Sequence, residues 1–130
     1  MKEKPSLEQW MTEAKNDKSA ANCGMYLLHN GTVRVTPKVK VREGVETDKE
    51  VKSMLFSYDE NLLSEIIADT YKLEGIYYVK TWLNEGILEA GEDIMYVLIG
   101  GDIRPRVIAG LDYIVGRIKN ECVEEKEIFK

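Results

Sequence analysis

The sequence predicts an α+β fold with antiparallel strands, and three observations support this class. Two long segments, residues 59–75 and 104–122, carry apolar side chains at helical spacing. Two others, Ile76–Leu83 and Ile94–Ile99, are rich in the β-branched, aromatic and aliphatic residues typical of strands. These segments alternate unevenly, which favours α+β over a repeating βα pattern. Since 44% of the 130 residues are hydrophobic, enough for one core, we expect a single domain over residues 1–130.

The N-terminal part is predicted to hold a short helix and a hairpin. Ser6 and Gln9 form a capping-box pattern, and the apolar residues around them share one helical face, so we expect a helix over residues 6–16. Residues 25–28 form a short apolar run that predicts a strand. Asn30-Gly31 is typical of a two-residue hairpin turn, so a second strand should follow it.

Residues 33–42 alternate between valines and polar or charged side chains, which predicts a strand, and Pro37 places it at a sheet edge. A connection over residues 44–49 and a strand over residues 54–58 should follow. In a strand, all the cations of this run would lie on one face: Arg34, Lys38, Lys40 and Arg42. This basic face has two readings, a site for a phosphate or an acidic tail peptide, or a solvated edge protected by its charges.

The two main helices have clear boundaries. Asp59 is an N-cap residue for the first, and Gly75 is expected to end it in the left-handed conformation. The second follows the turn Gly100-Gly101-Asp102 and carries Pro105 in its first turn. Its N-terminus, with Arg104 beside it, is either an anion site that uses the backbone around Gly101 or an ordinary glycine turn capped by Asp102.

Composition excludes several classes of function. A net charge of -5 and a pI near 5.0 argue against general nucleic-acid binding. The longest apolar run, Ile94–Ile99, is far shorter than the roughly 20 residues of a membrane-spanning helix, so we expect a soluble, cytoplasmic protein. Cys23 and Cys122 fit neither a metal site nor a disulfide framework and are expected to be small buried hydrophobes. The only histidine, His29, excludes a multi-histidine metal site and is expected to be structural, so we predict no cofactor.

Two lysines near the C-terminus are the candidate catalytic residues. Lys119 lies off the apolar stripe of the last helix, and Lys126 follows beyond the expected helix end. On pattern alone, two surface lysines normally serve solubility. A lysine that is partly desolvated, or set beside other cations, can have a lowered pKa and act as a base, a nucleophile or an anion clamp.

Several dispersed motifs occur in one order along the chain. Gly31-Thr32-Val33-Arg34 is similar to a Gly-Lys-Val-Arg element, and residues 86–92 reproduce a Gly-x-Leu-x-x-Gly-Glu hairpin. Arg104, Asp112, Lys119 and Lys126 then follow without a gap. From about residue 24 to residue 127 the chain thereby resembles the large, catalytic subunit of molybdopterin synthase, while residues 1–23 look like a helical extension.

The resemblance implies a fold, a reaction and partners. The fold is an α/β-hammerhead-like domain with two main helices and a short N-terminal one. The reaction is sulfur transfer from the thiocarboxylated Gly-Gly tail of a small ubiquitin-like carrier subunit to cyclic pyranopterin monophosphate, which makes molybdopterin for molybdenum cofactor biosynthesis. The assembly is a homodimer flanked by two carriers. Lys119 and Lys126 would be catalytic, and Arg34, Arg104, Gly101, Lys38 and Lys40 would bind substrate or tail anions.

The sequence also departs from the family pattern. Leu83-Asn84 and Ile103-Arg104 stand where the family has two His-Arg pairs, so both histidines are missing. Glu124 and Glu125 precede Lys126, where the family is apolar, and are expected to neutralise that lysine. Two readings therefore stay open: a catalytic subunit of a divergent branch, and a non-catalytic relative that binds a carrier or a pterin.

Overall fold

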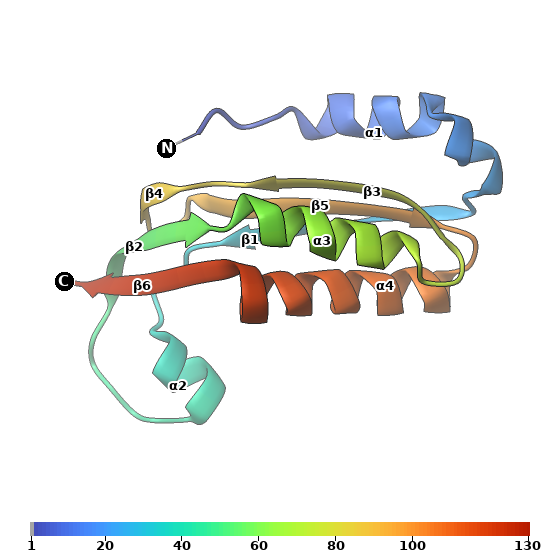
Figure 1. Ribbon diagram of the computed structural model, residues 1–130. Coiled ribbons are helices and arrows are strands. Elements are labelled where there is room, and N and C mark those ends of the chain that lie inside the picture. Colours follow the sequence, from blue (N-terminus) through green and yellow to red (C-terminus); the bar gives the residue numbers. More distant parts are fainter. Residues whose placement is uncertain (1) are drawn as a thin grey trace.

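The computed structural model describes residues 2–130 and has an α+β architecture with two antiparallel three-stranded sheets, as predicted (Figure 1). The first sheet has the order β1-β5-β3 and the second the order β4-β2-β6. The strands are β1 (Met25–Thr32), β2 (Val51–Tyr58), β3 (Ile76–Leu83), β4 (Gly86–Glu89), β5 (Asp93–Gly101) and β6 (Val123–Phe129). The helices are α1 (Leu7–Asn16), η1 (Lys18–Asn22), α2 (Lys38–Glu43), α3 (Glu60–Tyr71), α4 (Arg104–Arg117) and η2 (Ile118–Cys122).

Helices cover both faces of the first sheet. Helix α1 lies on one face, where Trp10 and Ala14 pack against Tyr96 and Leu98 of β5 (Figure 1). Helices α3 and α4 lie on the other face and share the main core with it, through residues such as Ile66 and Ile114. Because β5 is covered on both faces, it reads as one continuous apolar run, as the sequence indicated. Among residues 2–130, no helix combines the length and apolar character that crossing a membrane requires.

The predicted helix boundaries are largely confirmed. Ser6 Oγ accepts a hydrogen bond from Gln9 N at 3.2 Å and caps α1, and Asp59 Oδ1 accepts one from Leu62 N at 3.0 Å and caps α3. The backbone of Gly75 has a positive φ of 83°, but α3 ends earlier, at Tyr71. The glycine therefore forms the turn into β3 and is not the helix cap itself.

The predicted hairpin turn at Asn30-Gly31 is wrong. Both residues lie inside β1, which pairs with β5 up to Thr32, opposite Asp93. Asn30 is held there by a hydrogen bond of 3.0 Å from its Nδ2 to Asp93 Oδ1, and the register shifts between Gly31 and Thr32. The shift leaves Ile94 of β5 without a partner on β1, so the dipeptide lies beside a bulge in the neighbouring strand and is not a turn.

The predicted strand over residues 33–42 is also wrong. Val33 still bonds to the backbone of the turn before β5, but residues 38–43 form the short helix α2. Pro37 is its N-cap residue, and Glu127 of β6 supplies the missing cap because its Oε2 accepts a hydrogen bond from Lys38 N at 2.9 Å. A tertiary contact thus overrides the valine alternation.

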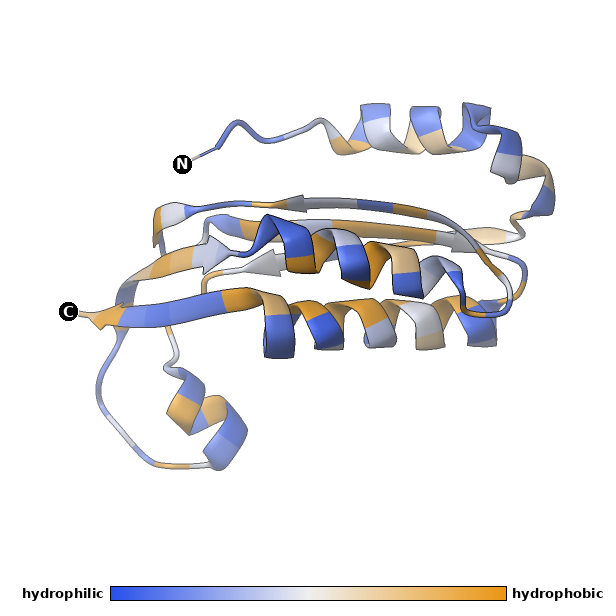
Figure 2. Cartoon of the chain, viewed as in Figure 1, coloured by the Kyte–Doolittle hydropathy of each residue, from blue (hydrophilic) through white to orange (hydrophobic). Residues whose placement is uncertain are grey.

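The last helix changes its winding before the chain enters β6. The α-helical pattern stops at Arg117, and the next turn is the π-helix η2, closed by a bond from Val123 N–H to Ile118 O. Strand β6 was not predicted, and its middle is hydrophilic, unlike the apolar strand β5 (Figure 2). It pairs with β2 along its whole length, which satisfies its backbone groups.

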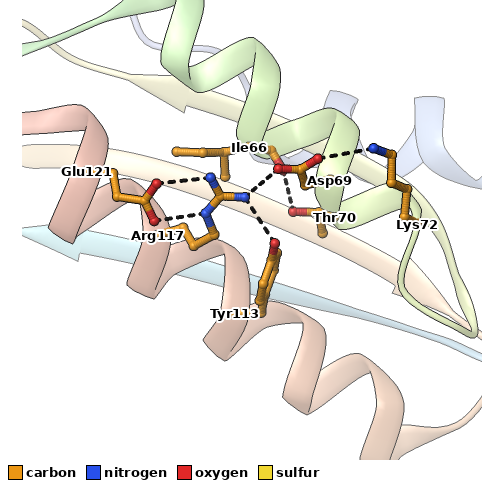
Figure 3. Close-up of polar contacts among 7 residues, drawn as sticks. All are labelled: Ile66, Asp69, Thr70, Lys72, Tyr113, Arg117 and Glu121. Carbon is orange, nitrogen blue, oxygen red and sulfur yellow. Dashed lines mark hydrogen bonds and ion pairs between the residues drawn. The ribbon is translucent and has the colours of Figure 1, made fainter.

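Arg117 fixes this unusual turn to the neighbouring helix α3 (Figure 3). Its guanidinium forms a bidentate pair with Glu121, with both N···O distances at 2.9 Å, and its Nη1 donates to Asp69 Oδ2 at 2.6 Å. The same nitrogen donates to Tyr113 Oη at 3.0 Å. These contacts with Arg117 lower the pKa values of the Asp69 and Glu121 carboxyls. Residues on both sides of Lys119 are therefore anchored.

Replacing Arg117 with Met should lower the melting temperature at neutral pH, because it removes both hydrogen bonds to Glu121 and the shorter of the two to Asp69. Because both carboxyl pKa values are lower in the folded state, their ionisation stabilises the fold, and this stabilisation is fully present when the pH is above the usual pKa values of 3.8 and 4.5. It is lost as the pH falls through the lower pKa values of the folded state. The difference from wild type should therefore shrink in acid, as followed by thermal melting from pH 7 to pH 3. Lys72→Met, which removes a 77% exposed partner of Asp69, should have a smaller effect. A wild-type melting temperature at pH 7 would contradict this role of Arg117.

Candidate functional site

A small hollow gathers positive charge from three separate parts of the chain. Arg34 comes from the segment after β1, Lys38 and Arg42 from α2, and Lys119 from η2. We call it the basic hollow; its other lining residues are Thr32, Met54, Ile94, Glu125 and Glu127. It brings together three of the predicted site residues, Arg34, Lys38 and Lys119, in a protein whose net charge is negative. Such a cluster favours an anion.

The helical form of α2 explains which of its cations reach the basic hollow. Residues four apart share one face of a helix, so Lys38 and Arg42 lie together. Lys40, two residues from each, points elsewhere and lines a separate hollow with Thr47 and Lys49. The predicted strand would have placed all four cations on one face. In the structure Arg34, Lys38 and Arg42 line the basic hollow and Lys40 does not, so the predicted basic face is confirmed only in part.

Strand β6 adds two carboxylates to the same hollow. Glu125 lies opposite the buried Phe56 of β2 and Glu127 opposite Met54, so both side chains point to the inner face of the second sheet. The Lys119 Nζ lies 3.8 Å from Glu125 Oε1, and the Glu125 side chain is only 8% exposed. The expectation that Glu125 pairs with Lys126 is therefore wrong, because its partner is Lys119.

Lys126 lies on the other face of β6. It is opposite Leu55, whose side chain is 45% exposed, and it lines an outer hollow with Ser57 and Glu124. Successive side chains of a strand alternate between faces, so a residue beside Glu125 must point away from it. Within one chain, the two predicted catalytic lysines therefore do not share a hollow.

Arg104 and Gly101 lie at the far end of α4 from Lys119. The helix and η2 place about 22 Å between residues 104 and 119, from the rise of an α-helix. A side chain on Gly101 would come within 2.8 Å of Val107 Cγ2, so this glycine allows close packing between β5 and α4. Asp102 Oδ1 accepts a hydrogen bond from Ile103 N at 2.6 Å and its Oδ2 one from Arg106 at 2.7 Å. Asp102 thus holds the turn through Ile103 and Arg106, but the N-cap residue of α4 is Ile103 and no side chain caps that helix, so capping by Asp102 is not confirmed and the anion site stays a prediction.

His29 is a neighbour of the basic hollow that sequence reasoning did not connect with it. Its Nε2 is buried without a hydrogen-bond partner among residues 2–130 and points toward Gly31, where an added Cβ would lie 3.4 Å away. Burial lowers the pKa of His29, and the positive charge of Lys119 lowers it further. The strand period could have indicated this, because His29 and the packed residues Met25 and Leu27 share one face of β1.

The remaining candidates for metal or redox chemistry give no site. Within residues 2–130, no group of three or more His, Cys, Asp or Glu side chains is placed to hold a metal ion. Cys122 is buried as expected, and its Sγ lies 3.3 Å from Asp59 O. Cys23 is only partly buried.

Comparison of the sequence with protein-family models decides the family. The model described as MoaE protein matches residues 1–121. This chain belongs to the MoaE family. The match covers most of the chain, includes the N-terminal helix and Lys119, and stops before Lys126. No curated protein matches the sequence.

Solved structures of MoaE-type proteins share the fold at low sequence identity. Molybdopterin synthase from Staphylococcus aureus superposes with a TM-score of 0.74 and 17% identity, over 98% of this chain and 88% of that one. A molybdopterin biosynthesis MoaE protein from Burkholderia ambifaria gives 0.72 and 17%, over 98% and 84%. A complex of subunits 1 and 2 of molybdopterin-converting factor from Helicobacter pylori gives 0.66 and 17%, over 95% and 75%. The α+β fold of the MoaE family is thus confirmed.

The link between His29 and Lys119 can be measured directly because the chain has one histidine. Lys119→Met should raise the pKa of His29 toward its usual value of 6.5, since it removes a positive charge that disfavours the imidazolium. Titration of the His29 Cε1–H signal by NMR measures this change. Lys126→Met, on the opposite face of β6, should leave the titration as in wild type. Equal shifts in the two variants would show that Lys119 is no closer to His29 than Lys126 is.

Proposed function

We propose that this MoaE-family chain is the catalytic subunit of a molybdopterin synthase. It would take sulfur from the thiocarboxylated Gly-Gly tail of a small ubiquitin-like carrier and transfer it to cyclic pyranopterin monophosphate. Family membership supports the role in molybdenum cofactor biosynthesis. The Helicobacter pylori neighbour, a complex of two subunits, supports a small-subunit partner. The observation that carries the proposal is the convergence of Arg34, Lys38 and Lys119 on one hollow.

The charges of the basic hollow suit both reactants. The substrate carries a phosphate, and the carrier tail ends in an anionic thiocarboxylate, so the site must hold negative charge. Arginine binds such groups through two parallel hydrogen bonds, and lysine acts as a point charge. Lys119 is partly buried, which suits a group that stabilises the oxyanion developing during acyl transfer. Arg34 and Lys38 would then fix the anion beside it.

The proposal gives the remaining predicted residues separate roles. Lys126 would meet the substrate or carrier on the outer face of β6. Arg104 is too far from Lys119 to serve the same reactant within one chain, so in a homodimer it would have to come from the second copy. Lys40 would lie at the rim. The missing family histidines favour the alternative, a non-catalytic carrier- or pterin-binding relative, and the assay below separates the two.

Purified protein, mixed with thiocarboxylated carrier and cyclic pyranopterin monophosphate, should form molybdopterin. Lys119→Met should lower kcat/KM by at least about a hundredfold, the usual scale for the loss of one group that stabilises transition-state charge. Molybdopterin is quantified by fluorescence after oxidation. Lys72→Met, which changes an exposed lysine beside Asp69 and outside the basic hollow, is the control and should keep near wild-type activity. If the protein binds the carrier but forms no molybdopterin, the result would favour the alternative, a non-catalytic binding subunit.

The role of Arg104 is tested by mixing variants. If Lys119 and Arg104 act from different copies, Lys119→Met and Arg104→Met should each be inactive, but an equal mixture should regain about a quarter of wild-type activity. Random exchange makes half the dimers mixed, and each mixed dimer holds one intact site of two. A mixture as inactive as its components would mean that both residues act from the same copy. Wild-type activity of Arg104→Met alone would remove Arg104 from the mechanism.

A further inference from the structure

Glu125 is a buried carboxylate that faces the candidate catalytic lysine. Its side chain is 8% exposed, against 26% for Lys119, and their charged atoms lie 3.8 Å apart. A carboxylate is rarely buried to this extent without a cationic partner, because its hydration is lost. Lys119 is that partner, at the edge of ion-pair distance. The pair is therefore part of how the basic hollow is built.

The basic hollow is also nearly filled by the protein itself. Glu125 faces Lys119, and Glu127 accepts the hydrogen bond from the first residue of α2, so two carboxylates stand among four cations. The free space is about 20 Å³, which is room for about one water molecule. A phosphate or a terminal carboxylate is larger than this. An anionic ligand must therefore move a group that now lies in the hollow.

The two carboxylates differ in what their movement would cost. Glu127 holds the N-terminus of α2 through a hydrogen bond of 2.9 Å, so its displacement would release that helix end. Among the described residues, the side chain of Glu125 has no hydrogen bond and only the longer ion pair with Lys119. A carboxylate held by one ion pair at 3.8 Å is the group that an incoming anion can most easily replace.

We propose that Glu125 is a positioning residue of this site, an internal counter-ion that holds the Lys119 ammonium in the empty hollow and is displaced when an anionic ligand binds. The inference rests on the proposed function, in which that ligand is an oxyanion. The thiocarboxylate of the carrier tail, the carboxylate left after its sulfur is transferred, and the substrate phosphate all carry such an anionic oxygen. A displaceable counter-ion accounts for a hollow that is lined by cations and yet has almost no free space. The affinity for an anion should then depend on Glu125, although Glu125 does not contact the bound anion.

The next residue along the strand is a matched control. Glu124 has the same side chain as Glu125 and directly precedes it in the sequence. It is exposed, however, and lies on the outer face of β6 with Lys126. Neutralising either glutamate changes the net charge of the protein by the same amount. A difference between them therefore reports the local contact with Lys119 and not the overall charge.

The test measures binding of two probes, inorganic phosphate and a synthetic peptide that ends in Gly-Gly with a free carboxylate. Glu125→Gln should bind both probes about three- to tenfold more tightly than wild type, since the ligand no longer competes with a carboxylate for Lys119. Glu124→Gln should bind as wild type does. A C-terminally amidated peptide should gain nothing from Glu125→Gln. Binding is followed by calorimetry and by the NMR signal of His29.

Glu125→Asp gives a second, graded variant whose shorter side chain keeps the charge but moves it away from Lys119. It should bind the probes with an affinity between those of wild type and Glu125→Gln, and thermal melting confirms that each variant is folded. Unchanged affinity of folded Glu125→Gln for both probes would overturn the proposal, and so would the absence of saturable binding in every variant. A gain for one probe alone supports displacement and identifies which anion enters the hollow.

Turnover separates this proposal from the proposed function. In an active enzyme, Glu125→Gln should lower the KM for the carrier and change kcat little, because in the bound complex Glu125 has already been displaced from Lys119. If no molybdopterin forms but Glu125→Gln still tightens phosphate binding, the proposed function fails and the counter-ion role stands. If the enzyme is active and neither KM nor affinity changes in Glu125→Gln, the counter-ion role fails alone.

Discussion

The pairing of β6 with β2 is the constraint on which the C-terminal half of the candidate site depends. Each residue of β6 is fixed by its partner: Glu125 opposite Phe56, Lys126 opposite Leu55 and Glu127 opposite Met54. A shift of one residue would exchange the two faces of the strand. It would then place Lys126 in the basic hollow and send both carboxylates outward. The register therefore decides which charges meet Lys119.

The π-turn η2 and the Arg117 contacts support that pairing. The chain runs on from α4 into β6 in the same general direction (Figure 1). The wide turn between them places Cys122 next to Asp59, whose N–H donates to Cys122 O at 3.0 Å. Arg117 and Glu121 tie the same turn to α3. Lys119 lies between these contacts in the chain. Such single turns of π-helix often occur at functional sites, because they redirect one side chain without ending the helix.

The sequence predicted the parts of the fold that carry strong periodicity and good caps. Helices α1, α3 and α4 and strand β5 were found because their apolar spacing and capping residues agree. Helix α2 and strand β6 were missed because long-range contacts create them. Alternating valines in residues 33–42 favour a strand locally, and Glu127 caps the helix from across the chain. The run Val-Glu-Glu-Lys-Glu has little strand character of its own and is held by β2.

The same distinction applies to the site. Arg34, Lys38 and Lys119 were predicted and converge, whereas the place of Lys126 follows from a strand that the sequence did not reveal. Glu125 and His29 were interpreted from their sequence neighbours, but their actual neighbours come from other elements. The order of the motifs also did not show that Gly101 and Arg104 lie far from Lys119. A straight helix lies between Arg104 and Lys119 and places them at opposite ends of the domain.

The central claim is that the tail of a sulfur carrier enters the basic hollow beside Lys119. The most direct measurement is mass-spectrometric mapping of the cross-link formed when a carrier with an activated C-terminal carboxyl is incubated with this protein. The predicted product is an isopeptide bond between the terminal glycine of the carrier and Lys119. Added phosphate should lower the yield of this cross-link, because it competes for the same hollow. Cross-links confined to lysines outside the hollow, such as Lys40 or Lys72, would contradict it.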